Sequence, residues 1–283
     1  MKQANRAAVV GKPISHSLSP VIHNAGYAAA GLSGWSYTRI ECAEAELPAL
    51  VGGLGPEWAG LSVTMPGKEA ALAVADAVSP VAAAVGAANT LVRRPDGSWY
   101  ADNTDVTGMV DVLTAAGCAA GATVTVLGAG GTARAAVAAA ARLGAAEVTV
   151  VARRPEAIED LRPVAEAAGV PLAGAPWDGN PAHARADVVI STVPKGVADP
   201  LAENFDWRPD SVFFDVVYDP WPTPLATAAL AAGCRVVSGL DLLLAQAVGQ
   251  FEHFTGVRAP VGEMAAALSA AVGLPVRATR PAG

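Results

Sequence analysis

The segment that most limits the possible folds is VTVLGAGGTA, residues 124–133. A run of apolar and β-branched residues leads directly into Gly128-x-Gly130-x-x-Ala133, and an alanine-rich helical pattern follows. Glycines in such a turn allow tight curvature and close approach of a pyrophosphate, and the helix start presents N–H groups to it. The spacing alone also occurs in ordinary tight turns. Its place between a strand and a helix predicts a dinucleotide-binding unit.

The strand predicted next along the chain indicates which dinucleotide would bind. NAD-binding sites usually end this strand with Asp or Glu, which hydrogen-bonds the ribose 2′-hydroxyl. Here the strand ends in Ala152-Arg153-Arg154, roughly twenty residues past the turn. Because guanidinium groups pair strongly with phosphate, this pattern favours NADP over NAD. The alternative is that one or both arginines are solvated surface residues.

The first half of the chain predicts an α/β domain. Short β-like runs alternate with helical ones, and the turn sequence Pro95-Asp96-Gly97 between two β-like arms predicts a hairpin. Strands are expected at residues 7–11, 37–42 and 60–66, with helices after the first and third and at 43–53.

The second half predicts a Rossmann-like domain followed by a helical tail. A helix at 105–117 leads to the glycine turn, and we expect the tail helices to pack back on the first domain. Three further buried strands are expected within residues 186–194, 211–219 and 234–239. The predicted class is α/β with two domains and a cleft between them: an N-terminal substrate domain, residues 1–106 completed by helices in 240–283, and a C-terminal Rossmann-like NADP-binding domain, residues 107–239.

Composition excludes several classes of partner. The 283 residues are 52% hydrophobic, enough for two cores, and carry a net charge of -7, which disfavours nucleic acid and acidic membranes. A small-molecule substrate is therefore favoured. The start of the chain lacks a signal-peptide pattern, so we expect a cytoplasmic protein. Three distant cysteines predict reduced, buried thiols, and four scattered histidines give no metal motif, so no metal is expected.

Residues 11–31, GKPISHSLSPVIHNAGYAAAG, predict a helix whose start binds an anion. Ser19 is the expected N-cap, Pro20 the first helical residue, and Gly31 lies just past the end. Together with the hydroxyls of Ser17 and Ser19, the helix start could hold a carboxylate without an arginine. The alternative, that Ser19 only caps the helix, leaves Ser17 unexplained.

Other polar side chains follow predicted strands where loops would meet the cleft. They are Thr64 and Lys68 in VTMPGK, Asn89 in GAANT, and Asp105 with its neighbours in ADNTD. A lysine, a carboxylate, an amide and hydroxyls suit a small polyhydroxylated acid. Taken singly, Lys68 fits a solvated surface lysine, and Asp105 fits the N-cap of the helix that follows.

Seven ordered motifs carry a resemblance to a known family over nearly the whole chain. They are GKPISHSLSPVIHN, VTMPGK, GAANT, ADNTD, GAGGTA, YDPWPTPL and SGLDLLLAQ, and with them the chain resembles the shikimate dehydrogenases. That resemblance implies NADPH-dependent reduction of 3-dehydroshikimate to shikimate in aromatic amino acid biosynthesis. Dimers are common in the family, so a homodimer is expected, although no residue here marks its interface.

The resemblance also implies roles for individual residues. Lys68 would be the catalytic acid/base, and Asp105 would orient it. Substrate contacts are implied for Ser17, Ser19, Thr64, Lys68, Asn89, Asp105, Tyr218 and Gln246. Without the resemblance, Gln246 fits a solvent-facing residue equally well. Cofactor contacts are implied for Gly128, Ala129, Gly130, Gly131, Thr132, Ala152, Arg153, Arg154, Thr192, Val216 and Gly239.

Two positions depart from the family pattern, and two rival functions stay open. Ala152-Arg153-Arg154 stands where the family often has Asn-Arg-Thr, and Gly67 stands where an apolar residue usually precedes the lysine. One rival is a quinate/shikimate dehydrogenase that uses NAD, which predicts an acidic residue after VTVV. The other is a catalytically silent ligand-binding paralogue, which could lack Lys68 or Asp105.

Overall fold

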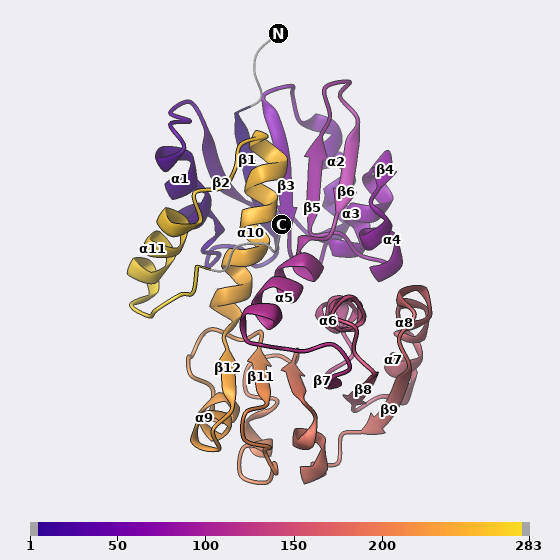
Figure 1. Cartoon of the computed structure of the whole chain (residues 1–283). Helices are drawn as coiled ribbons and strands as arrows, with labels where there is room; N and C mark the ends of the chain where they lie inside the picture. Colours follow the sequence, from indigo (N-terminus) through magenta and orange to yellow (C-terminus); the bar gives the residue numbers. More distant parts are fainter. Residues whose placement is uncertain (1–4, 279–283) are drawn as a thin grey trace. The chain divides into compact units, whose positions relative to one another are not determined.

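The computed structural model describes residues 5–278, which divide into two compact units. Unit 1 contains residues 5–107 and 243–278, and unit 2 contains residues 108–242. Two helices, α5 (Thr104–Ala115) and α10 (Gly239–Thr255), continue from one unit into the other. The predicted α/β class, with a Rossmann-like second half, is confirmed (Figure 1).

Unit 1 is built on a six-stranded mixed sheet in the order β2-β1-β3-β5-β6-β4. Strand β1 pairs in parallel with the edge strand β2 and with β3, and β5 pairs antiparallel with both β3 and β6. The hairpin predicted around Pro95-Asp96-Gly97 joins β5 to β6. The strands are β1 (Arg6–Gly11), β2 (Ser36–Glu41), β3 (Trp58–Val63), β4 (Ala77–Val78), β5 (Thr90–Arg93) and β6 (Trp99–Asp102).

Helices of unit 1 pack closely because glycines stand at the crossing points. A Cβ on Gly26 of α1 would lie 2.9 Å from the Phe251 ring of α10, and one on Gly60 of β3 would lie 2.3 Å from the Phe254 ring. These glycines bring α10 directly onto α1 and β3. Helix α1 also packs against α11 (Figure 1). The helices are α1 (Ser19–Ala29), α2 (Leu47–Gly53), α3 (Lys68–Val74), α4 (Pro80–Val85) and α11 (Val261–Val272), with a short 3-10 turn at Glu44–Glu46.

Unit 2 contains an all-parallel sheet in the order β12-β11-β10-β7-β8-β9. Read from β9, this is the strand order of dinucleotide-binding folds, in which the chain reverses direction across the sheet next to the first strand, here β7. Strands β10 and β11 are wholly buried, as expected for a parallel sheet covered on both faces. The strands are β7 (Thr123–Leu127), β8 (Glu147–Ala152), β9 (Leu172–Pro176), β10 (Val188–Ser191), β11 (Val212–Asp215) and β12 (Arg235–Val237).

The helices of unit 2 pack on different strands of its sheet. Helix α6 packs on β7 and on α8, whereas α9 packs on β11 and β12. They are α6 (Gly131–Arg142), α7 (Pro155–Glu159), α8 (Arg162–Ala168) and α9 (Pro224–Ala231), with 3-10 turns at Pro181–Arg185 and Asp199–Leu201. No helix within residues 5–278 has the length and apolar character needed to cross a membrane.

The three cysteines are free thiols, and two match the expectation of burial. Cys42 and Cys234 are buried, whereas Cys118 is partly exposed. The expectation was wrong for Cys118 because it lies in the loop after α5 rather than in an element of the core. In the described part of the chain, no group of three or more His, Cys, Asp or Glu side chains could hold a metal ion.

Candidate active site

The start of α1 differs from its prediction by one residue. Leu18, not Ser19, occupies the N-cap position, and Ser19 is the first helical residue. The N–H of Ser19 points to Ser17 Oγ at 3.3 Å, and the N–H of Val21 donates to Leu18 O at 3.0 Å. Pro20 has no N–H, so few backbone donors remain for an anion. Any attraction for a carboxylate therefore comes from the two serine hydroxyls and the helix dipole.

The loop after β3 places Thr64 and Lys68. The N–H of Thr64 donates to Val10 O, and the N–H of Gly67 donates back to Thr64 O, which closes a turn before α3. Gly67 is buried, and a Cβ there would lie 3.2 Å from Val63. Lys68 begins α3, and its carbonyl accepts the Ala88 N–H at 2.9 Å. The backbone of Lys68 is thus fixed from both sides.

The Lys68 side chain forms an ion pair with Asp105. Lys68 Nζ lies 2.6 Å from Asp105 Oδ2, and the two side chains are 24% and 12% exposed. The alternative of a solvated surface lysine is therefore wrong. A partly buried ammonium held by a carboxylate is an arrangement suited to proton transfer with a bound ligand.

Asp105 is free to pair because another residue caps α5. The Asn103 side-chain oxygen accepts the N–H of Asp105 at 3.1 Å, and the Asn103 amide donates to Ala87 O at 2.9 Å. Asn103 thus serves as the capping residue, and the alternative that Asp105 is the N-cap is wrong. Sequence reasoning named Asn103 only among the polar side chains near the cleft and gave it no capping role, although an Asn directly before the first helical residue is a recognisable capping signal.

Asn89 holds the first turn of α5. Its side-chain oxygen accepts the N–H of Thr104 at 2.8 Å and the Thr90 hydroxyl at 2.8 Å, and its amide donates to Thr104 Oγ1 at 3.0 Å. Since an amide nitrogen carries two protons, one is left for a ligand. The structure therefore links Asn89 to the helix that carries Asp105.

The other two predicted substrate residues lie in different units. Gln246 is in the part of α10 that belongs to unit 1, is buried, and donates to Leu243 O at 2.7 Å, so a solvent-facing position is excluded. Tyr218 lies in unit 2, in the loop after β11, and is half-buried.

The glycine turn of unit 2 fits a pyrophosphate. Gly128 has φ +102, and a Cβ there would lie 2.8 Å from Thr192 Oγ1, which itself donates to Leu127 O. By contrast, Cβ atoms on Gly130 or Gly131 would meet nothing within 4 Å. No side chain caps α6, which begins at Gly131. The turn therefore offers backbone N–H groups, including that of Thr132, to open space at a helix N-terminus.

The end of β8 and the start of α10 complete the predicted cofactor set. Ala152 is buried, whereas Arg153 and Arg154 are exposed, and their side chains form no ion pair or hydrogen bond with any residue in 5–278. Their guanidinium groups are therefore available to a phosphate. Gly239 opens α10, and a Cβ on it would lie 2.1 Å from Val216 O, so a larger residue cannot fit there.

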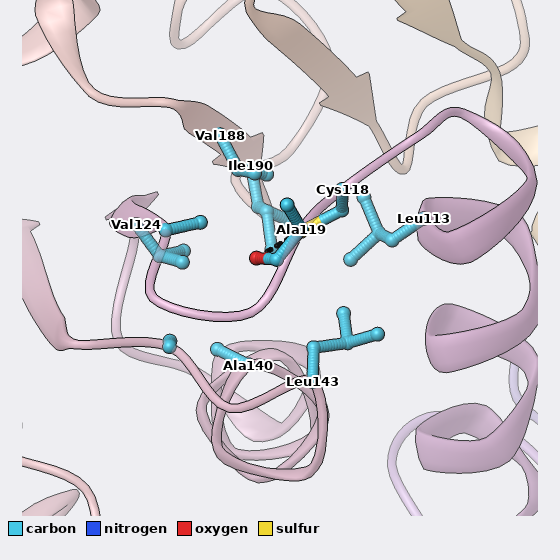
Figure 2. A pocket seen from close by; sticks show the side chains of 10 residues that line it. Leu113, Cys118, Ala119, Val124, Ala140, Leu143, Val188 and Ile190 are labelled. Carbon is cyan, nitrogen blue, oxygen red and sulfur yellow. Dashed lines mark hydrogen bonds between the residues drawn. The ribbon is translucent and has the colours of Figure 1, made fainter.

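Two pockets within unit 2 lie away from the glycine turn. One, shown in Figure 2, is apolar and leaves no space for a water molecule; its lining includes Leu113, Cys118, Val124, Ala140, Leu143, Val188 and Ile190. The other encloses about 220 Å³ near Cys118, Asp187 and Arg208. Val124, Val188 and Val212 begin or nearly begin their strands, whereas ligands of such sheets bind beyond the carboxyl ends. Neither pocket is the expected cofactor site.

Family models match three parts of the chain. The shikimate dehydrogenase substrate binding domain matches residues 9–91, and the shikimate 5′-dehydrogenase C-terminal domain matches residues 239–268. Residues 101–216 match the C-terminal domain of alanine dehydrogenase/PNT. A shikimate dehydrogenase (NADP(+)) of Moorella thermoacetica is 38% identical, covering 94% of this chain and 93% of its own. The chain belongs to the shikimate dehydrogenase family.

Solved structures of the shikimate dehydrogenase family agree with this assignment. The Mycobacterium tuberculosis shikimate dehydrogenase has a TM-score of 0.86 at 48% identity, covering 94% of this chain and 99% of its own. The Thermus thermophilus enzyme, in complex with NADP(H) and shikimate, has a TM-score of 0.82 at 33% identity, with coverage of 94% and 99%. A quinate dehydrogenase from Corynebacterium glutamicum in complex with NAD has a TM-score of 0.83 at 27% identity, with coverage of 96% and 100%.

Proposed function

We propose that the protein catalyses the reversible reduction of 3-dehydroshikimate to shikimate with NADPH. The observation that carries this proposal is the ion pair between Lys68 and Asp105, at 2.6 Å, in the unit that matches the family's substrate binding domain. The family relatives named for NADP-dependent shikimate dehydrogenation support the choice of substrate and cofactor.

The proposed chemistry divides between the two units. When bound in unit 2, NADPH supplies the hydride that reduces the ketone carbon. The Lys68 ammonium donates a proton to the ketone oxygen, where negative charge accumulates. Asp105 keeps the ammonium in place and accepts a hydrogen bond from a neighbouring substrate hydroxyl. In the oxidative direction, Lys68 takes the hydroxyl proton back.

Substrate orientation is assigned to the remaining polar side chains. Ser17 and Ser19 hold the carboxylate through their hydroxyls. The free amide proton of Asn89, with Thr64, Tyr218 and Gln246, contacts the ring hydroxyls. This division suits a small acid with several hydroxyls, because each polar group of the substrate gains a partner when water is displaced.

The cofactor roles follow the fit of the glycine turn. Gly128 to Thr132 hold the pyrophosphate with backbone N–H groups, and Arg153 and Arg154 hold the 2′-phosphate beside Ala152. Thr192, Val216 and Gly239 lie along the nicotinamide half. We also assign the protein to the cytoplasm, where its three free cysteines would stay reduced, and expect a homodimer in solution.

One comparison tests the function against both rivals. Steady-state rates are measured with shikimate and with quinate, each with NADP and with NAD, by the absorbance of the reduced cofactor. Turnover mainly with shikimate and NADP is expected. Comparable rates with quinate or NAD would assign the protein to the quinate/shikimate class. Binding without turnover for every pair would favour the silent paralogue.

Arg153→Asp is expected to reverse the cofactor preference. The exposed guanidinium has no acidic partner in the described chain, so its replacement by a carboxylate repels the 2′-phosphate and provides an acceptor for the ribose 2′-hydroxyl of NAD. We expect kcat/KM for NADP to fall about 100-fold or more, and that for NAD to change less than about fivefold. Arg162→Asp is the control, because Arg162 is an exposed arginine paired with Glu159. Equal losses for both cofactors would show that Arg153 does not recognise the phosphate.

A further inference from the structure

Gln250 is a buried amide in α10 with a partner for each end of its side chain. It is 1% exposed. Its oxygen accepts the Ser62 hydroxyl at 2.7 Å, and its nitrogen lies 3.2 Å from Asn89 O and 3.2 Å from Thr90 Oγ1. Because Asn89 O can only accept, the orientation of the amide is fixed. A single side chain of α10 thus joins β3 to the start of β5.

Two hydroxyl groups in series donate hydrogen bonds toward the side-chain oxygen of Gln250. The Tyr37 hydroxyl donates to Ser62 Oγ at 2.6 Å, and Ser62 donates in turn to Gln250. Burial raises the pKa of the Tyr37 hydroxyl well above its usual range, so Tyr37 remains a donor. The His23 ring stacks on the Tyr37 ring with centroids 4.1 Å apart. In this series of hydrogen bonds Tyr37 donates to Ser62 and Ser62 donates to Gln250. Because no bond in the series can run the other way, the network has a single arrangement.

The backbone segment that Gln250 holds, residues 88–90, reaches both members of the ion pair. The N–H of Ala88 donates to Lys68 O at 2.9 Å. The side chain of Asn89 accepts the N–H of Thr104, the residue before Asp105, at 2.8 Å. A shift of this segment would therefore change the position of Lys68 and of Asp105 by separate routes.

Helix α10 lies close enough for this contact because of a further glycine. A Cβ on Gly249 would lie 3.2 Å from the Thr104 side chain. Gln250 is also one turn after Gln246, so the two amides share a face of the helix. The face of α10 that carries Gln246, a proposed substrate contact, therefore also carries Gln250, which contacts residues 88–90.

We propose that Gln250 is a positioning residue that sets the geometry of the Lys68–Asp105 pair by fixing residues 88–90 against α10. This inference rests on the proposed function for its effect on turnover. It predicts that the contact matters for kcat, since a proton donor displaced by a fraction of an ångström loses its alignment while the binding groups of the substrate stay in place.

Gln250→Met tests the proposal, because methionine has a similar length and no hydrogen-bonding amide. We expect kcat for shikimate oxidation to fall about tenfold, with KM for shikimate within about threefold of the wild type. Ser79→Ala is the matched control. It removes a buried hydroxyl that caps α4 in the same unit, so it lowers the melting temperature without touching residues 88–90. The control is expected to keep the wild-type kcat.

Chemical labelling of Lys68 gives a second readout that needs neither substrate nor cofactor. The protein is treated with trinitrobenzenesulfonate, and labelling of the Lys68 peptide is followed by mass spectrometry. Asp105 shields the ammonium in the wild type, so Gln250→Met is expected to label at Lys68 about threefold faster or more. The exposed Lys12 gives an internal reference, and its labelling rate is expected to stay unchanged.

The outcomes separate this inference from the proposed function. If the wild type lacks turnover with every substrate and cofactor pair, the function fails, and faster labelling of Lys68 in Gln250→Met still supports the positioning role. If the wild type is active, unchanged kcat and unchanged labelling in Gln250→Met overturn the inference, as does a rise in KM alone. Should Gln250→Met not fold, Ser62→Ala removes one contact of Gln250 and is expected to show the same changes at about threefold in kcat.

Discussion

Lys68→Ala is expected to lower kcat for shikimate oxidation by about 100-fold to 10,000-fold, the usual contribution of a positioned acid or base. The loss falls on kcat because the ammonium is needed when charge moves on the substrate oxygen. In the proposed site, shikimate is bound mainly by hydroxyl and amide groups of other elements. Its dissociation constant, measured by calorimetry without cofactor, is therefore expected to stay within about fivefold of the wild type.

The control for this prediction is Lys12→Ala. Lys12 is also a lysine of unit 1, but its side chain is 53% exposed and lies 3.8 Å from Glu41. Because exposed ion pairs contribute little, this variant is expected to keep both kcat and stability. Wild-type turnover in Lys68→Ala would remove Lys68 from the chemistry. A large loss of shikimate affinity with intact kcat would make Lys68 a binding residue instead.

The Rossmann-like unit was predictable because its signals are local. Buried strands followed by turns can be recognised within a few residues. At Gly128 the backbone has a positive φ and the Thr192 side chain leaves no room for a Cβ, so only glycine fits. Strand β9 escaped prediction for the opposite reason. Its sequence, LAGAP, contains one large apolar residue and is mostly exposed at the edge of the sheet. Pairing with β8 forms it, and pairing is not visible in the segment itself.

The candidate site was predictable as a set of residue types but not as contacts. Lys68 and Asp105 are 37 residues apart in the chain, and no periodicity links them. The start of α1 shows the same limit at short range. The sequence predicts Ser19 as the N-cap, but Leu18 occupies that position and the Ser17 hydroxyl accepts the N–H of Ser19. Gln250 is a polar residue in an apolar helix, which signals a buried partner but does not identify it.

His23 is expected to make unit 1 unstable to acid. The ring is wholly buried, and burial lowers its pKa from 6.5 to about 3, while the Gln250 amide opposes this only in part. Its ring nitrogens lack a hydrogen-bond partner of good geometry in the described chain. Between these two pKa values the unfolded chain binds a proton that the folded chain excludes. The free energy of unfolding therefore falls as pH falls through this range, by up to about 1.4 kcal/mol per pH unit.

His23→Phe isolates this contribution, because phenylalanine keeps a flat ring against Tyr37 and cannot titrate. Near neutral pH the two proteins are expected to differ by less than about 1.5 kcal/mol. Toward pH 4 the wild type is expected to lose roughly 3 kcal/mol more than the variant, since carboxylates that titrate in the same range act equally on both. Hydrogen exchange in α1 and α10 measures the opening of unit 1 itself.

The exposed His16, replaced by Gln, is the control and should follow the wild type. Parallel losses in wild type and His23→Phe would mean that His23 is not the group that acid protonates on unfolding.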